Sequence, residues 1–379
     1  MKIIIVGTAY PLRGGIAHFN ALLAEHLAQT HSVGTITFKR QYPKIFFPGT
    51  TQEEAGESHP AEPAPQMVDS INPLNWLGVG RYISRLKPDL LIFKYWMPFF
   101  APCFGTIARV VKKRTGAKVL FICDNIIPHE HRPGDLLLTR YAFKTVDCFI
   151  VQSDAVERDL QKLFPRASYR KVAHPVYENF GKPIPREEAR RMLRISSENV
   201  ILFFGYVRPY KGLMILLEAL AILRDRMAGS GSGPMPLLLA VGEYYDDEAK
   251  YRARARELNV ESHIRFVSEY VPNDAVGQYF SAADAVILPY RSATQSGIAQ
   301  IAYNFDKPVI ATNVGGLAEV VIDGRTGYVV PPDDPASLAG AIARFFEQRK
   351  GEDFSGAVKI EKRKYGWENL TRAIDELVG

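Results

Sequence analysis

The sequence predicts two doubly wound α/β domains in tandem, each built on a parallel β-sheet. Short apolar segments of strand-like composition alternate with helical patterns along the whole chain. The alternation stops at Glu178–Glu187, a stretch that contains Gly and Pro, and then starts again. With 379 residues the chain is long enough for two substantial cores. Such a pair predicts a cleft between the domains, with ligands at the carboxyl ends of the strands.

The first domain is expected to span residues 1–178. Its predicted strands are Ile3–Val6, Val33–Phe38, Leu90–Phe93, Lys118–Ile122 and Cys148–Val151. A helical pattern covers Ala17–Gln29, directly after a glycine-containing loop. The segment Pro48–Gln66 is rich in Pro, Gly, Ser, Thr and Glu, which is typical of a surface loop.

The second domain is expected to span residues 179–365. Its predicted strands are Val200–Phe204, Leu237–Val241, His263–Phe266, Ala285–Leu288 and Pro308–Ala311. The run Gly229–Gly233 is predicted to be a flexible loop between a helix and a strand. The last segment, 366–379, contains the amphipathic pattern Trp367–Val378, and we expect this helix to cross back onto the first domain.

The composition is ordinary for a soluble globular protein, with 47% apolar and 23% charged residues. No apolar run is long enough to span a bilayer, and Met1–Gly7 predicts a buried first strand rather than a signal peptide. Cys103, Cys123 and Cys148 have no metal-type spacing. A cytoplasmic location is therefore expected.

The net charge of +6 favours anionic partners. The sequence contains no recognisable nucleic-acid-binding motif, so nucleic acid is not an expected partner. Phosphorylated substrates or an anionic membrane surface explain the excess of cations better.

The stretch Gly205–Gly212 connects the predicted strand Val200–Phe204 to a helical pattern. A short turn between a strand and a helix directs backbone N–H groups and the positive helix end toward an anion. Arg208 and Lys211 add two cations at this point, and an arginine fork with a lysine point charge suits a diphosphate. The alternative is a surface turn with two solvated cations.

Six motifs occur in order along nearly the whole chain. They are Arg13-Gly14-Gly15-Ile-Ala17, Pro128-His129-Glu130, Gly205–Gly212, Phe280-Ser-Ala-Ala-Asp284, Thr312–Glu319 and Asp323–Gly327. In this order and spacing they resemble the retaining glycosyltransferases of family 4, which have the GT-B fold of two tandem Rossmann-like domains. The resemblance implies transfer of a sugar from a nucleoside diphosphate sugar to an acceptor hydroxyl, with retention at the anomeric carbon, in polysaccharide, glycolipid or cell-envelope glycan synthesis.

The resemblance also implies roles for particular residues. Arg208 and Lys211 would stabilise the charge that grows on the leaving diphosphate. Gly14 and Gly15 would bring bare backbone close to the donor diphosphate or the acceptor, with a plain βα turn as the alternative. His18 is a candidate for catalysis or acceptor binding, and a helix cap is the alternative.

One segment departs from the family pattern. The family carries two glutamates, with about seven residues between them, that hold the donor sugar and the nucleotide ribose; an ungapped match places Ala293 and Ile301 there. We expect Gln295–Gly297 to replace the first carboxylate and Gln300 to replace part of the second, with neutral hydrogen bonds roughly half as strong as charge-assisted ones. The expected donor-binding residues are therefore Gly14, Gly15, Gly205, Gln295, Ser296, Gly297 and Gln300.

A second departure lies at Cys123-Asp124-Asn125, where many relatives carry a histidine near the reacting carbon. Asp124 is a candidate for orienting the acceptor hydroxyl, and a turn residue that ends the preceding strand is the alternative. His129 and Glu130 follow closely and are the other acid/base candidates, with Glu130 on the acceptor side.

Neither a metal nor another cofactor is expected, because Arg208 and Lys211 neutralise the diphosphate. The pairs Asp246-Asp247 and Asp333-Asp334 lie in predicted loops and are interpreted as solvated turn acids. Asp284 precedes a predicted strand and is expected to fix a loop rather than to take part in catalysis.

Two other classes of function stay open. A GT-B-fold nucleotide-sugar epimerase would use a similar cleft, but it needs carboxylates around the sugar, which the segment 292–303 lacks. A non-catalytic subunit that binds a nucleotide sugar is favoured by the missing glutamates.

The acceptor is expected to be a glycan or a lipid-linked glycan. The segment Tyr95–Phe104 is rich in aromatic residues and is followed by Arg109 and by Lys112-Lys113-Arg114. One interpretation seats this segment on an anionic membrane, as a peripheral protein at the inner face of the plasma membrane. The alternative is a buried strand–helix segment with solvated basic residues.

Overall fold

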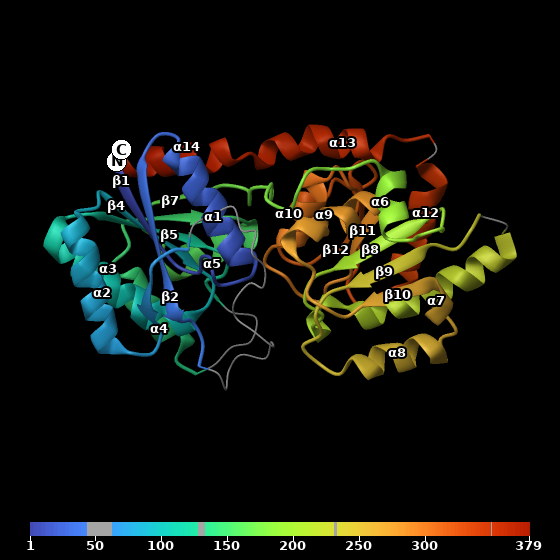
Figure 1. Ribbon diagram of the computed structural model, residues 1–379, viewed down its shortest axis with the longest axis horizontal. Helices are drawn as coiled ribbons and strands as arrows, with labels where there is room; N and C mark the ends of the chain where they lie inside the picture. Colours follow the sequence, from blue (N-terminus) through green and yellow to red (C-terminus); the bar gives the residue numbers. More distant parts are fainter. Residues whose placement is uncertain (44–62, 128–132, 231–232, 350) are drawn as a thin grey trace. The chain divides into compact units, whose positions relative to one another are not determined.

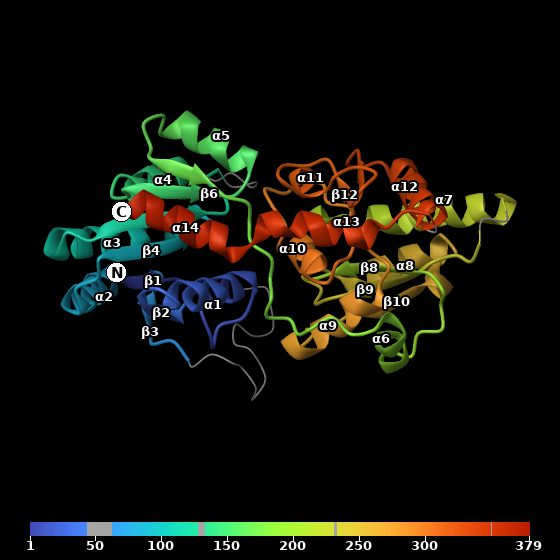
Figure 2. The same ribbon diagram turned by 90° about the horizontal axis from the view of Figure 1, so that it is seen from above.

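The protein is described by a computed structural model, which covers residues 1–43, 63–127, 133–230, 233–349 and 351–379. The chain divides into two compact units, each with its own core (Figures 1 and 2). The first unit comprises Met1–Pro175 and Gly366–Gly379, and the second comprises Val176–Tyr365. The boundary between the units therefore lies at 175–176 rather than at the expected 178–179.

The first unit is built on a parallel sheet of seven strands in the order β3-β2-β1-β4-β5-β6-β7. The strands are β1 (Lys2–Val6), β2 (Ser32–Arg40), β3 (Gln66–Asp69), β4 (Leu90–Tyr95), β5 (Lys118–Cys123), β6 (Cys148–Val151) and β7 (Tyr169–Lys171). The direction of strand addition reverses between β1 and β4. Ligands of doubly wound sheets bind beside the carboxyl ends of the strands at such a reversal.

Helices cover both faces of the first sheet, so its central strands are continuous apolar runs (Figure 1). One face packs on α2 (Pro73–Leu86), α3 (Ala101–Thr115), α4 (Asp135–Phe143) and α5 (Asp154–Leu163). The other face carries α1 (Gly15–Ala28) and α14 (Trp367–Val378). Local signals set the starts of two helices: Asn72 accepts hydrogen bonds from the first turn of α2, and Ser153 accepts one from Val156 in α5.

The second unit contains a parallel sheet of six strands in the order β10-β9-β8-β11-β12-β13. The strands are β8 (Val200–Phe204), β9 (Leu237–Val241), β10 (Ile264–Val267), β11 (Ala285–Leu288), β12 (Val309–Thr312) and β13 (Gly327–Val330). Here the direction of strand addition reverses between β8 and β11, which makes the carboxyl ends of these two strands the expected ligand edge.

Helices also cover both faces of the second sheet. The core on one face is formed with α7 (Leu213–Ser230), α8 (Glu248–Glu257), α12 (Pro335–Gln348) and α13 (Phe354–Glu361). The remaining helices are α6 (Arg186–Met192), α9 (Asn273–Ala282), α10 (Gly297–Asn304) and the short α11 (Leu317–Val320). The turn after β8 contains a 3-10 helix, η3 (Pro209–Lys211).

The predicted strands are all present, and four of them have the expected bounds: β6, β8, β9 and β11. The sequence did not predict the edge strands β3, β7 and β13, which are short and weakly apolar in two cases. Two loop predictions need correction, because Gln66 begins β3 and α7 continues through Gly229 to Ser230. Residues 48–62, most of the predicted loop Pro48–Gln66, lie outside the described residues.

The C-terminal helix α14 belongs to the first unit, as expected (Figure 2). Its first residue, Trp367, is 1% exposed and stacks on His26 of α1 with ring centroids 5.2 Å apart. Near its end, Asp375 lies 2.9 Å from His31 Nε2. These contacts connect the two ends of the chain within one core.

The aromatic segment Tyr95–Phe104 is part of the core of the first unit. Tyr95, Phe100 and Phe104 are fully buried, which favours the core alternative for these aromatic residues, and a peripheral membrane contact of this segment stays a prediction. The basic residues that follow have partners inside the unit, since Arg109 lies over the Tyr141 ring and Lys112 pairs with Asp147. Within the described residues, no helix is long and apolar enough to cross a bilayer.

Candidate functional site

In the second unit, Arg208 and Lys211 lie in the turn between β8 and α7, at the carboxyl edge of the sheet. Glycines shape this turn. Gly205 has φ 95°, and Gly212 has φ 72° with its Cα directly against the Pro289 carbonyl, so a Cβ at either position is strained. The turn is also fastened to the loop after β11, because Arg291 N donates to Tyr210 O at 2.7 Å. The carboxyl ends of β8 and β11 are thereby held together.

The Lys211 side chain is folded back into this turn. It is 8% exposed, and its Nζ lies 3.1 Å from the position that a Cβ on Gly205 would occupy. Burial, and then the neighbouring Arg208 charge, lower the pKa of Lys211 to about 7. Among the residues that the structure describes, no carboxylate pairs with either cation. Two adjacent cations without an acidic partner form a site for an anion.

The first turn of α10 lies beside the same point. The Gly205 Cβ position is 3.3 Å from Ile298 Cδ1, and a Cβ added at Gly297 would lie 3.0 Å from the Tyr177 ring. The Tyr290 and Ser296 hydroxyls are neighbours, and both residues are buried. Sequence reasoning missed Tyr290, although its place directly after β11 is a usable signal.

The loop 292–296 is held by the two glycines after β12. Gly315 has φ 46° and lies against the Ala293 carbonyl, and Gly316 N donates to Thr294 O at 3.0 Å. Close backbone packing thus accounts for the Gly-Gly pair.

The proposed substitutes for the two missing glutamates lie in this loop and at the start of α10. Gln295 and Gly297 are partly exposed, whereas Gln300 is 1% exposed and its Oε1 has no partner within the described residues. Ile301 is 4% exposed and packs inside. Their roles in donor binding stay predictions.

In the first unit, Asp124 directly follows β5 at the carboxyl edge of the sheet. Its Oδ1 lies 2.6 Å from Nζ of Lys94, which is 1% exposed on β4. Sequence reasoning missed Lys94. The signal was a single charge in the apolar run Leu90–Tyr95.

Gly14 ends the loop before α1 and Gly15 begins the helix; Gly14 has φ 113° with open space at its Cβ position. His18 is 4% exposed in the second turn of α1, and its roles in catalysis, acceptor binding or capping stay predictions. His129 and Glu130 lie outside the described residues.

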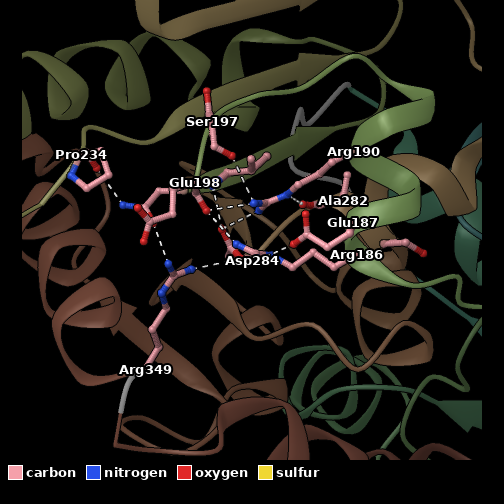
Figure 3. Close-up of polar contacts among 12 residues, drawn as sticks. Arg186, Glu187, Arg190, Ser197, Glu198, Pro234, Ala282, Asp284 and Arg349 are labelled. Atoms are coloured by element: carbon pink, nitrogen blue, oxygen red, sulfur yellow. Dashed lines mark hydrogen bonds and ion pairs between the residues drawn. The ribbon is translucent and has the colours of Figure 1, made fainter.

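Asp284 has a structural role at the opposite, amino-terminal edge of the second sheet (Figure 3). Its carboxylate accepts hydrogen bonds from Arg186 Nε at 3.0 Å and Arg190 Nη2 at 2.9 Å. Arg349 lies 3.1 Å away, and the backbone N–H of Val200 donates at 2.7 Å. The expectation that Asp284 fixes a loop is confirmed.

The acidic pairs Asp246-Asp247 and Asp333-Asp334 stabilise turns and cap helices. Asp247 caps α8 and Asp334 caps α12, while Asp246 pairs with Lys250 and Asp333 with Arg291. No cluster of three metal-ligating side chains occurs in the described ranges.

Known proteins share this sequence and fold. The profile of the family described as "Glycosyl transferases group 1" matches residues 185–363. The D-inositol 3-phosphate glycosyltransferase of Acidothermus cellulolyticus is 30% identical over 389 residues, which cover 95% of this chain and 84% of that protein. The enzyme of the same name from Corynebacterium glutamicum is 34% identical over 188 residues, 46% of this chain and 42% of that protein. Against this relative and two others, the match spans less than half of the relative's length.

Solved structures show the same fold. Sucrose-phosphate synthase from Thermosynechococcus elongatus superposes with a TM-score of 0.74 at 20% identity, covering 100% of this chain and 98% of that one. The Anabaena protein HepE, determined in complex with UDP, gives a TM-score of 0.74 at 18% identity over 99% of each chain. The two parallel-sheet units therefore have the GT-B architecture, and the chain belongs to the glycosyl transferases of group 1.

Proposed function

We propose that this protein transfers a sugar from a nucleoside diphosphate sugar to an acceptor hydroxyl, with retention at the anomeric carbon and without a metal ion. One observation carries the proposal: Arg208 and the buried Lys211 lie side by side at the strand reversal of the second sheet, with no carboxylate partner in the described residues. A diphosphate supplies the missing negative charge.

The two cations act on the leaving group. As the glycosidic C–O bond breaks, negative charge grows on the diphosphate oxygen. Lys211 is buried in the turn, where its charge stabilises the leaving group more strongly than it would in water, and the exposed Arg208 beside it adds a guanidinium fork. The cations already neutralise the diphosphate, so the proposal needs no divalent cation.

The transfer step balances within the two substrates. The bond from the anomeric carbon to the leaving phosphate oxygen breaks while the acceptor oxygen forms its bond on the same face of the sugar. The acceptor proton passes to the departing phosphate oxygen. This step needs no pair of carboxylates on opposite faces of the sugar ring.

The relatives support a nucleotide-sugar donor and leave a choice of acceptor. HepE was determined with UDP and with UDP-glucose, which makes UDP-glucose the first donor to test. The D-inositol 3-phosphate glycosyltransferases suggest a phosphorylated polyol as one acceptor. We include a glycan or lipid-linked glycan made at the cytoplasmic face of a membrane as the other.

The experiment compares Arg208→Ala and Lys211→Met with the wild type in nucleotide release from UDP-, GDP- and ADP-sugars. The preferred donor is first identified as the one that raises the unfolding temperature most. Each substitution should lower kcat by about 10²–10³-fold, the usual loss when a preorganised charge-stabilising donor is removed. Near wild-type rates in both variants would exclude the diphosphate role.

Two control variants separate the site from general effects of charge. Lys307→Met removes another lysine whose pKa is lowered by burial, to about 8. Unlike Lys211, this lysine precedes β12 and donates to the Ser281 carbonyl of α9. Arg344→Ala removes an arginine that stacks on Tyr328, as Arg208 stacks on Tyr245. Both controls should keep kcat close to the wild-type value.

Retention and metal independence are tested with the purified protein. NMR of the product should show the anomeric configuration of the donor, and a chelator should leave the rate unchanged. An inverted product or a chelator-sensitive rate would contradict these parts of the proposal.

A second candidate is a nucleotide-sugar-binding subunit without activity. It is favoured by Ala293 and Ile301, which cannot supply the family's two carboxylates. Donor binding without release of nucleotide, with or without acceptors, would select this candidate. Isomerisation of the donor sugar without an acceptor would instead reveal an epimerase.

A further inference from the structure

The first unit contains a buried ion pair that the donor site does not explain. Lys94 Nζ lies 2.6 Å from Asp124 Oδ1. The lysine side chain is 1% exposed, whereas the Asp124 side chain is 15% exposed. The pair therefore has one end inside the core and one end near the surface.

The Lys94 ammonium has its contacts inside the protein. It faces Asp124 and donates to Gln152 Oε1 at 2.6 Å. The ammonium also lies 3.5 Å from the centroid of the Phe19 ring, a cation–π contact. Because Lys94 is also 1% exposed, its ammonium is not open to a ligand from solvent.

The pair is costly to bury and unnecessary for packing. Every other residue of β4 is apolar or aromatic and fully buried. Burial lowers the pKa of Lys94, and the neighbouring Asp124 carboxylate opposes this effect. Replacing a buried ion pair by apolar residues of similar volume is often neutral or stabilising. Stability of the fold alone therefore gives no reason for a lysine here.

The residue next to the Lys94 ammonium adds no second positive charge. His174 lies edge-on to Phe19 with ring centroids 5.2 Å apart. Burial, and then the charge of Lys94, lower the pKa of His174 to about 4, so this imidazole is neutral at physiological pH. The ammonium thus meets a carboxylate, an amide oxygen and an aromatic face.

Asp124 stands where a substrate group is expected in a doubly wound sheet. It follows β5, which neighbours β4 at the strand reversal, and its backbone N–H donates to Tyr95 O at 2.8 Å. Backbone and side chain are both tied to β4. The carboxylate can turn only if it breaks its bond to Lys94.

We propose that Lys94 is a positioning residue that holds the Asp124 carboxylate in the orientation in which it accepts a hydrogen bond from the acceptor hydroxyl. The inference rests on the proposed glycosyl transfer. Lys94 acts through Asp124 and touches no substrate itself. Asp124 is the catalytic residue of the pair.

The test is a double-mutant cycle with Lys94→Met, Asp124→Asn and the double variant. Turnover is measured as nucleotide release from UDP-glucose, with D-inositol 3-phosphate or water as acceptor. Each single change should lower kcat by about 10²-fold, the size of loss expected when a reacting group is displaced by about 1 Å. The double variant should be no slower than either single variant, because residues that act as a unit give non-additive losses.

The cycle also separates positioning from folding. Lys94→Met alone removes the bonded cation of the Asp124 carboxylate and is expected to lose stability, whereas the double variant removes both charges and is expected to fold. UDP binding by calorimetry reports on the second unit and should change by less than about twofold. Asp147→Asn is the matched control: it removes a carboxylate bonded to Lys112 and Val119 N at the opposite edge of the sheet, and it should keep kcat.

The outcomes are distinct. Folded Lys94→Met protein with wild-type kcat, or losses that multiply in the double variant, would overturn the positioning role while the transferase proposal stands. Wild-type protein that binds no nucleotide sugar, or binds one without releasing nucleotide, would overturn the proposed function and with it the role of Lys94.

Discussion

The Lys211 ammonium nitrogen lies 3.1 Å from the position that a Cβ atom on Gly205 would occupy. Gly205 directly follows β8 with φ 95°, a conformation that residues with a side chain rarely adopt. The missing side chain therefore lets the chain turn sharply and leaves room for the lysine head group beside the backbone. The proposed donor site and the shape of the turn therefore depend on the same glycine.

Gly205→Ala should weaken donor binding more than it weakens the fold. The backbone strain costs about 1–2 kcal/mol of stability, and the added methyl displaces Lys211 Nζ. Gly181→Ala is the control, because Gly181 has φ 84° but nothing within 4 Å of its Cβ position. Calorimetry with UDP-glucose should show a loss of affinity in Gly205→Ala alone, and equal affinities in the two variants would contradict this.

Donor affinity should fall as pH rises above about 7. The Lys211 pKa of the free protein is about 7, and a bound diphosphate raises it, so at higher pH the site must take up a proton on binding. The dissociation constant of UDP-glucose should rise by up to about tenfold per pH unit in this range. Titrations from about pH 6 to about pH 9 measure this. Lys211→Met should bind weakly with a flat profile, and a pH-dependent variant would assign the titration to another group.

Local sequence patterns predict most of the fold, and they also predict the part of the candidate site around Arg208 and Lys211. The apolar runs of the central strands and the glycines around Arg208 and Lys211 are contiguous in sequence, so their chemistry can be predicted before any packing is known. The strands β3 and β7 lie at sheet edges, where partial exposure removes the apolar signal.

The Lys94–Asp124 pair could not be predicted in the same way. The two residues are far apart in sequence, and they meet only because β4 and β5 are adjacent in the sheet. The sequence did show a lone lysine in an apolar strand. Its partner depends on strand order, which the local pattern does not specify.

Asp284→Asn should destabilise the second unit without changing kcat of the folded protein. The substitution removes the negative charge that pairs with three arginines, of which Arg190 is 5% exposed. Breaking a buried ion pair on one side costs about 3–5 kcal/mol. Asp333→Asn is the control, because its pair with Arg291 is more than half exposed on both sides and is worth about 0–1 kcal/mol. Denaturant unfolding of both variants measures the difference. A similar stability for the two would show that the arginines do not depend on Asp284.

Trp367→Ala should destabilise the first unit and leave the second unit protected. The indole is 1% exposed and packs on His26 and Phe19, so its removal creates a cavity that costs about 3–5 kcal/mol. Ile360→Ala is the control, because Ile360 is 64% exposed on α13 of the second unit. Hydrogen exchange should accelerate in α1 and β1 of Trp367→Ala and stay unchanged in β8 and β11. Since Phe19 also faces the Lys94 ammonium, this variant should lower kcat as well. Unchanged exchange in α1 would mean that the C-terminal helix contributes little to the core on which it packs.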